Sequence, residues 1–203
     1  MLTLYIGNKN YSSWSMRPWV LLRQAGIEFT EHKERFDSFE AQSQFKHALL
    51  ALNPHGKVPV LVDQGLVVWD SLAIVEYVAE KFPELALWPR ETPLRARARS
   101  LCADIHSGYT ALRHHCGMNI EADLRDVGQS LWTQKADLRE DVHRLCQVLT
   151  KPLSQQAKPA MMMGEFGLPE VIRGITEPSM TRKPATPRTL NCGSSTAIAS
   201  SSR

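Results

Sequence analysis

The sequence lacks any apolar run approaching the roughly 18 residues that a membrane-spanning helix needs, so it does not predict an integral membrane protein. The first residues lack the basic flank of a signal peptide, and residues 2–6 have the pattern of a short strand. None of the four cysteines belongs to a Cys-x-x-Cys pair, which argues against a zinc ribbon or a dithiol redox site. We therefore expect a cytoplasmic protein with idle or buried thiols and no metal.

A strong excess of one sign of charge is also missing. The 203 residues carry 24 lysines and arginines against 21 aspartates and glutamates. Residues 1–150 are close to neutral, and the positive excess falls in residues 151–203. Because a neutral body offers no electrostatic attraction for phosphates, we expect neither a nucleic acid nor a membrane among the partners.

Aromatic residues and apolar periodicity are scarce in residues 151–203, where Phe166 is the single aromatic residue. The same segment holds half of the 12 prolines. This composition predicts a largely disordered tail. The abrupt change in composition favours an altered reading frame or a truncated gene over a natural tail acquired for binding.

Residues 1–82 contain alternating strand and helix patterns separated by turn residues. The expected elements are a strand at 2–6, a helix from about 15 to 25, a strand at 27–33, a helix at 39–50, strands at 58–62 and 66–69, and a helix at 70–81. Gly26 stands where a helix C′ residue belongs, and Asp70 can cap the last helix. The order β-α-β-α-β-β-α predicts an α/β layer with a mixed sheet.

The apolar period changes to a helical one after a proline-containing linker at residues 83–92. Apolar residues then recur every three or four positions over residues 94–116, and over residues 124–149 with one step of seven. This pattern predicts two long amphipathic helices, packed as an antiparallel pair in an all-α domain over residues 93–150.

Polar residues gather in three loops that this topology brings to one edge of the sheet. The loops are residues 11–18, residues 53–59 and the pair Asp70-Ser71. The serines of the first loop precede a helix N-terminus, where a hydroxyl and the helix dipole can stabilise a thiolate. The chain has no cysteine at this place, so the thiol would come from a ligand.

Three motifs in this order resemble those of cytosolic glutathione transferases, serine-type and near the zeta class. They are Ser12-Ser13-x-Ser15-x-Arg17, Val58-Pro59 and Asp70-Ser71, and the resemblance covers roughly residues 1–150. It implies a thioredoxin-like glutathione-binding domain over residues 1–82, a cis proline at Pro59, and a helical domain that this chain carries incompletely. Residues 164–168 resemble the start of the family's helix-capping segment, but no helical pattern follows.

The resemblance also implies a role for each matching residue. Ser12 matches the catalytic serine, and Ser13 stays open as the second candidate. Val58 would hydrogen-bond the cysteinyl backbone of glutathione in strand fashion, Ser71 would hold the γ-glutamyl carboxylate, and Asp70 would pair with the γ-glutamyl ammonium. The remaining residues assigned to glutathione binding are Trp14, Arg17, Lys57 and Pro59. Arg17 has an alternative role in an ion pair within the fold. The serines of the first loop could be loop hydroxyls bonded to their own backbone, and Asp70 and Ser71 could form an ordinary helix cap.

The pocket for a second substrate is placed against residues 94–118 by the same resemblance. His106, Tyr109 and Arg113 are spaced three and four residues apart, so they would share a face of one helix and line this pocket. Tyr109 could instead belong to the core. The neighbouring His114-His115-Cys116 run does not predict a metal site, because adjacent helical residues point in different directions.

The expected function is that of a glutathione transferase. It would stabilise the glutathione thiolate and conjugate it to a small hydrophobic electrophile, in detoxification chemistry, as a homodimer, without a covalent enzyme intermediate. One alternative is a non-catalytic binding module, because the second domain looks incomplete. Another is a glutathione-dependent cis–trans isomerase, although Trp14 replaces the cysteine of the zeta-class motif and weakens an assignment to maleylacetoacetate isomerisation.

Overall fold

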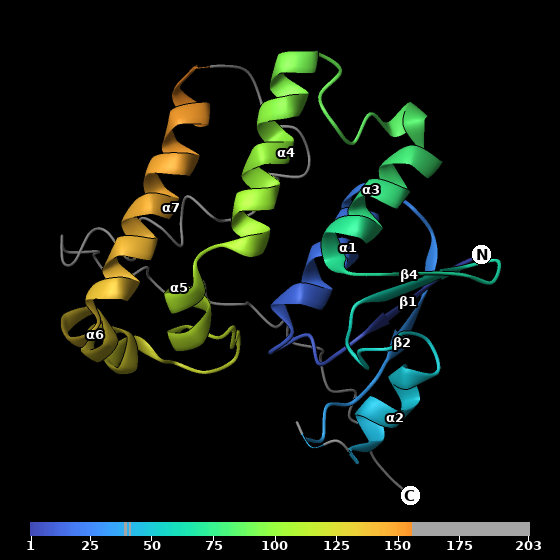
Figure 1. Cartoon of the computed structure of the whole chain (residues 1–203), viewed down its shortest axis with the longest axis horizontal. Coiled ribbons are helices and arrows are strands. Elements are labelled where there is room, and N and C mark those ends of the chain that lie inside the picture. The colour runs from blue at the N-terminus through green and yellow to red at the C-terminus, as the bar shows by residue number, and fades with distance from the viewer. Residues whose placement is uncertain (39, 41, 156–203) are drawn as a thin grey trace, which may run out of the picture. The chain divides into compact units, whose positions relative to one another are not determined.

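The computed structural model describes residues 1–38, 40 and 42–155 (Figure 1). The predicted disordered tail begins at residue 151, so its first five residues are described and belong to the last helix, whereas residues 156–203, with the capping segment at 164–168, lie outside the described part. The strands are β1 (Leu2–Ile6), β2 (Phe29–Lys33), β3 (Val60–Asp63) and β4 (Leu66–Trp69). The helices are α1 (Ser13–Gln24), α2 (Gln44–Leu50), α3 (Ser71–Lys81), a short 3-10 helix at Pro83–Leu85, α4 (Thr92–Ser107), α5 (Thr110–His115), α6 (Arg125–Gln134) and α7 (Ala136–Gln155).

The four strands form one mixed sheet in the order β2-β1-β3-β4. Strand β1 pairs in parallel with β2, and β3 pairs antiparallel with both β1 and β4. The register places Leu4 opposite Glu31 on one side and Leu61 on the other. The predicted β-α-β-α-β-β-α order and the mixed sheet are confirmed.

Helices α1 and α3 bury the apolar face of this sheet. Leu4 of β1, Leu61 of β3, Leu22 of α1 and Ile74 of α3 have no exposed surface, and they belong to one hydrophobic cluster. Burying such a side chain contributes about 1.5–3 kcal/mol. This core fixes the loops that leave β1 and β3 and the N-termini of α1 and α3.

Local signals explain where these helices begin and end. Gly26 has a φ of 67°, the left-handed conformation of a C′ residue, as predicted. The carboxylate of Asp70 accepts the N–H groups of Leu72 and Ala73, which confirms its role as the N-cap of α3. Helix α2 begins after Ser43, whose hydroxyl accepts the Lys46 N–H, so the expected start of this helix at residue 39 is wrong.

The expected two long helices after residue 92 are four helices in the structure. The first prediction fails at Tyr109, which adopts the left-handed conformation with a φ of 60° and separates α4 from α5. The second fails at Lys135, whose extended backbone separates α6 from α7. The three-and-four apolar spacing continues across the first break, and the second break falls in a step of seven residues between Leu131 and Leu138 that keeps the same helical face. The spacing alone therefore did not reveal either break. Helix α7 continues past residue 150 to Gln155.

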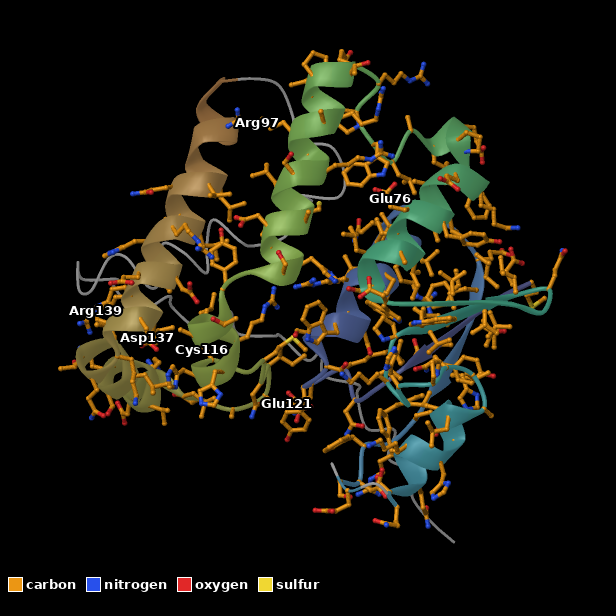
Figure 2. All side chains as sticks on the ribbon, viewed as in Figure 1. Glu76, Arg97, Cys116, Glu121, Asp137 and Arg139 are labelled. Carbon is orange, nitrogen blue, oxygen red and sulfur yellow. The ribbon has the colours of Figure 1, made fainter. Side chains whose placement is uncertain are left out.

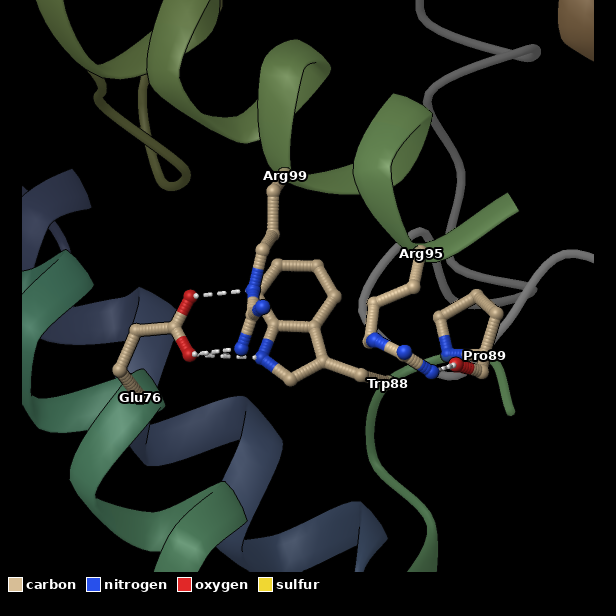
Figure 3. Close-up of polar contacts among 5 residues, drawn as sticks. All are labelled: Glu76, Trp88, Pro89, Arg95 and Arg99. Carbon is tan, nitrogen blue, oxygen red and sulfur yellow. Dashed lines mark hydrogen bonds and ion pairs between the residues drawn. The ribbon is translucent and has the colours of Figure 1, made fainter. Parts of the chain in front are cut away.

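Polar contacts join α3 to α4 across the linker (Figure 3). The Glu76 carboxylate accepts hydrogen bonds from the Trp88 indole at 2.9 Å and from Nε and Nη2 of Arg99 at 3.2 and 3.0 Å. Arg95 donates to the Pro89 carbonyl at 3.0 Å. In the part of the chain that the structure describes, no helix is long and apolar enough to cross a membrane.

Candidate functional site

Ser12 and Val58 meet at Gly7, directly after β1. A Cβ added to Gly7 would lie 3.3 Å from Ser12 Cβ and 3.3 Å from Val58 Cγ2, closer than most real Cβ contacts. Gly7 therefore lets the serine loop and the loop before β3 approach each other closely. The structure brings together two residues that are 46 positions apart in the sequence.

Hydroxyl groups organise the first turn of α1. The N-cap Ser12 accepts the Ser15 N–H at 3.4 Å, and the two hydroxyl oxygens lie 2.8 Å apart. The Gly7 N–H donates to Ser15 Oγ at 3.1 Å, and Ser15 is only 1% exposed. Ser12 is half-buried, so its hydroxyl lies at the rim of this network.

Asn10 anchors the loop before Ser12 to the segment between α5 and α6. Its side chain donates to the Glu121 carboxylate at 2.7 Å and accepts the Ile120 N–H at 2.9 Å. Glu121 is labelled in Figure 2, in the segment that follows Cys116. These two hydrogen bonds hold the loop from outside the sheet.

Asn53 shapes the loop that leads into β3. This 3% exposed side chain accepts the His55 N–H and, at 3.4 Å, the Lys57 N–H, and it donates to the Lys57 carbonyl at 3.0 Å. The Val58–Pro59 peptide bond is cis, in agreement with the expectation from the resemblance. Lys57 points its exposed side chain to solvent.

The backbone of Val58 is free to receive a ligand. Its N–H and C=O groups have no hydrogen-bond partner in the described part of the chain, because the ladder between β1 and β3 ends at Tyr5 and Val60. A half-buried backbone segment with both groups free can bind an extended peptide by strand-like hydrogen bonds.

The α3 N-terminus holds a buried hydroxyl that lacks a partner. Ser71 is 2% exposed, and its Oγ makes no hydrogen bond to any described residue. The preceding Asp70 has a φ of 76° and a ψ of 133°, a strained conformation for a residue other than glycine. A helix N-terminus with an orphaned hydroxyl suits a carboxylate, since both the N–H groups and the helix dipole favour an anion.

Trp14 is the centre of a second group of side chains. The Arg17 and Arg113 guanidinium carbons lie 4.2 and 4.6 Å from its ring centroid, and the His106 ring packs edge-on at 5.3 Å. Nε2 of His106 lies 3.2 Å from the Asp70 carboxylate. Trp14, at the start of α1, is thus linked to Asp70 through His106 of α4 and also contacts Arg113 of α5.

Burial perturbs both arginines, and the charge of Arg113 also acts on Arg17. The pKa of Arg17 is lowered by burial and by the nearby positive charge of Arg113, and burial also lowers the pKa of Arg113. Arg113 donates to the carbonyls of Gly108 and Ile105, so it also stabilises the end of α4. Arg17 makes no hydrogen bond or ion pair closer than 4 Å to a described residue, although the nearby Asp70 carboxylate partly opposes the lowering of its pKa.

Comparison with known proteins identifies the family. The family model for the N-terminal domain of glutathione S-transferase matches residues 11–81. Glutathione S-transferase 1 of Dianthus caryophyllus is 30% identical over 182 residues, which cover 86% of this chain and 78% of that protein. The chain belongs to the glutathione S-transferase family.

Other relatives agree with this assignment to the transferase family. A probable maleylacetoacetate isomerase of Caenorhabditis elegans is 32% identical over 111 residues, 55% of this chain and 49% of that protein, so this match spans about half of the relative's length. The theta class glutathione S-transferase of Xanthomonas axonopodis pv. citri, solved with glutathione bound, has a TM-score of 0.56 at 25% identity. That match covers 79% of this chain and 76% of the Xanthomonas protein.

One residue assigned from the sequence to the pocket for a second substrate lies apart from the side chains around Trp14. Tyr109 is 3% exposed, and its hydroxyl donates to the Asp104 carboxylate at 2.7 Å. The spacing argument that placed it beside His106 and Arg113 is wrong, because these residues do not share one helix. Its conformation turns the chain between α4 and α5 and its ring packs against Arg144.

Three residues that contribute to this site of the transferase received no role from the sequence. They are Gly7, Ser15 and Asn53. Ser15 lies within the recognised motif and Asn53 within the recognised turn, so their positions were visible, but their contacts depend on tertiary structure. Gly7 matters because of two loops that approach it, and nothing local in the sequence predicts that approach.

Proposed function

We propose that the chain binds glutathione along Ser12, Val58 and Ser71, stabilises its thiolate, and transfers it to a small hydrophobic electrophile. The single observation that carries this proposal is the close approach of the Ser12 and Val58 side chains at Gly7, which brings the Ser12 loop next to a residue whose backbone N–H and C=O groups are unpaired in the described part of the chain. The orphaned Ser71 hydroxyl supports it, because it supplies a place for the γ-glutamyl carboxylate. Membership of the transferase family makes glutathione the expected thiol.

The chemistry of the proposal is stabilisation of a charge. A hydrogen bond to a charged sulfur contributes about 1.5–3 kcal/mol, and the N-terminus of α1 adds about 0.3–1 kcal/mol. Since one pKa unit corresponds to about 1.36 kcal/mol, these effects lower the thiol pKa by roughly one to three units. The bound thiol then becomes largely thiolate at neutral pH and attacks the electrophile directly, without metal chemistry or an acyl or alkyl enzyme.

The remaining residues have supporting roles in this proposal. Val58 bonds the cysteinyl backbone, and Asp70 pairs with the γ-glutamyl ammonium while it also contacts His106. Lys57 and Arg17 contribute positive charge for the carboxylates of the tripeptide. The Trp14 ring, with His106 and Arg113, forms one wall for the electrophile. The working form is a cytoplasmic homodimer, as in the family.

Binding and ultraviolet absorbance of the thiolate test this proposal. We expect the protein to be retained on immobilised glutathione and bound glutathione to show a thiolate band at neutral pH. Ser12→Ala should abolish most of that band, whereas Ser13→Ala should retain it. A wild-type protein without a thiolate band, or a band unchanged in both variants, would contradict the proposal.

A glutathione-dependent cis–trans isomerase is the second candidate, favoured by the relatives of that kind in the comparison. Both activities need the same thiolate, but an isomerase returns glutathione unchanged. Measuring glutathione consumption with an electrophile, against product formation from a cis-enone without consumption, separates them. Glutathione binding with neither activity would support a non-catalytic binding module.

A further inference from the structure

We propose that Ser15 is a positioning residue that fixes the direction of the Ser12 hydroxyl, so that Ser12 can only donate a hydrogen bond toward the ligand. This inference rests on the proposed function and deepens it, because it concerns the same thiolate. The observation behind it is the buried Ser15 hydroxyl, which has no direct contact with glutathione in the proposed function. Ser15 is 1% exposed and touches two partners, the Gly7 N–H and the Ser12 hydroxyl.

The 2.8 Å contact between the two hydroxyl oxygens is compatible with either serine as the donor, because a hydroxyl hydrogen rotates about its C–O bond. The two arrangements differ in what they leave unpaired. If Ser12 donated, Ser15 would accept two hydrogen bonds and its own hydrogen would point at no acceptor among the described residues. A donor left unpaired in a buried position is unfavourable.

The opposite arrangement satisfies the buried Ser15 and leaves only the hydrogen of the half-buried Ser12 without a partner among the described residues. Ser15 then accepts the Gly7 N–H and donates its own hydrogen to Ser12 Oγ. Ser12 accepts this hydrogen together with the Ser15 N–H, so both of its acceptor positions face the helix. The Ser12 hydrogen has one direction left, away from Ser15 and toward the half-buried rim of the site.

A hydroxyl oriented in this way is a prepared donor for a thiolate. It needs no reorganisation when the charge forms, which is the condition under which a hydrogen bond lowers a pKa most effectively. The consecutive hydrogen bonds from the Gly7 N–H to Ser15 and from Ser15 to Ser12 also polarise one another, which strengthens each of them. Ser13 has no hydrogen bond of its side chain to a described residue, so nothing there fixes its direction.

The test measures the pH midpoint of the thiolate band of bound glutathione in the full chain. We expect Ser15→Ala to raise this midpoint by about one unit, which lowers the thiolate fraction roughly tenfold well below the midpoint. Ser12→Ala should raise it by at least as much. Because Ser15 acts through Ser12, the double variant Ser12→Ala/Ser15→Ala should match Ser12→Ala alone.

Two further variants separate positioning from a general loss of structure. Ser15→Thr keeps the hydroxyl and should keep the wild-type midpoint. Ser43→Ala removes another buried capping hydroxyl, 5% exposed, which contacts neither Ser12 nor Ser15. It should lower thermal stability and leave the midpoint unchanged. If Ser15→Ala does not fold, Ser15→Cys replaces the hydroxyl by a weaker donor of similar size and should also raise the midpoint.

The outcomes distinguish this inference from the proposed function. A wild-type midpoint equal to that of free glutathione contradicts both. If the midpoint rises in Ser12→Ala and stays at the wild-type value in Ser15→Ala, the proposed function is intact and the inference is overturned. Where Ser15→Ala does not fold, an unchanged midpoint in Ser15→Cys has the same meaning. A double variant in which the two shifts add also overturns it, because Ser15 would then act independently of Ser12.

Discussion

The sheet region and the helical region of this protein differ in how they bury their apolar residues. Strands β1 and β3 with helices α1 and α3 supply a continuous core whose central side chains have no exposed surface. Helices α4, α5 and α6 contain no buried residue. Among the described residues from the start of α4 onward, the buried ones are Tyr109 and three side chains of α7.

This difference shows what each region contributes to the site. The proposed glutathione contacts come from loops held by the core of the sheet, so their geometry is set by strands and helix N-termini. The proposed electrophile wall depends on His106 and Arg113, which lie on less buried helices. A well-buried region for the proposed glutathione contacts and a less buried region for a variable electrophile agree with the tendency of functional residues to lie on less stable segments held by a stable scaffold.

The largest expected effect comes from deleting the same side chain in each region. Leu22→Ala, at a site with no exposed surface, should lower the free energy of unfolding by about 2–5 kcal/mol, because it leaves a cavity. Leu124→Ala, at a side chain 45% exposed, should change it by less than about 0.5 kcal/mol. Chemical denaturation followed by circular dichroism measures both.

Equal decreases in the free energy of unfolding for Leu22→Ala and Leu124→Ala would contradict the difference in burial between the two regions. A large loss for Leu124→Ala would mean that another surface covers α6 in solution. Repeating the measurement at several protein concentrations would then show whether that surface is a second copy of the chain.

The same contrast explains how far the sequence predicted the fold. In residues 1–82, turn residues, caps and strand patterns all agreed, and the predicted order of elements is the observed one. In the helical region, a regular apolar spacing predicted one helix where two exist, because a stripe reports which face is apolar and not whether the backbone continues. The turn at Tyr109 depends on a non-glycine residue in the left-handed conformation, which has no clear local signal.

The candidate site was predictable where residues form motifs and not where contacts join distant loops. Ser12, Val58 and Ser71 could be assigned from short patterns. The support from Gly7, the direction of the Ser15 hydroxyl and the link between Asn10 and Glu121 come from tertiary packing. Trp14 departs from the family motif, and the motif does not predict the packing of its ring against Arg17 and Arg113.

A smaller effect is expected at the junction of the two regions, where Glu76 connects α3 with Trp88 and Arg99. Glu76→Gln should lower the free energy of unfolding by about 1–3 kcal/mol, because it weakens two hydrogen bonds to a cation and one to a buried indole. Glu80→Gln, an exposed residue one turn further along α3, is the matched control and should have no effect. Urea unfolding at neutral pH compares the variants, and equal stabilities would show that the junction is not held by this carboxylate.

Acid should act on the sheet region through Asp63, which is 5% exposed. The hydrogen bond from Lys81, followed by that from Tyr77, lowers the pKa of Asp63 below its usual value. The stabilisation is therefore present above the ordinary aspartate pKa of about 3.9 and is lost as the pH falls through the lowered value. Thermal unfolding of the wild type and Asp63→Asn between neutral pH and pH about 2 should show the largest difference at neutral pH and convergence at the acid end. A constant difference would contradict this linkage.

The smallest effect is expected at Asp123, although its pKa is lowered to about 2 by Arg125. These side chains are 62% and 88% exposed, and they are only two residues apart. Solvent screens the pair, and a contact this local can also form in the unfolded chain, so the shift contributes little to folding. Asp123→Asn should leave the thermal midpoint unchanged at every pH where Asp63→Asn lowers it. Equal effects of the two variants would mean that a lowered pKa alone, and not the burial that distinguishes the two regions, determines the contribution of a carboxylate to stability.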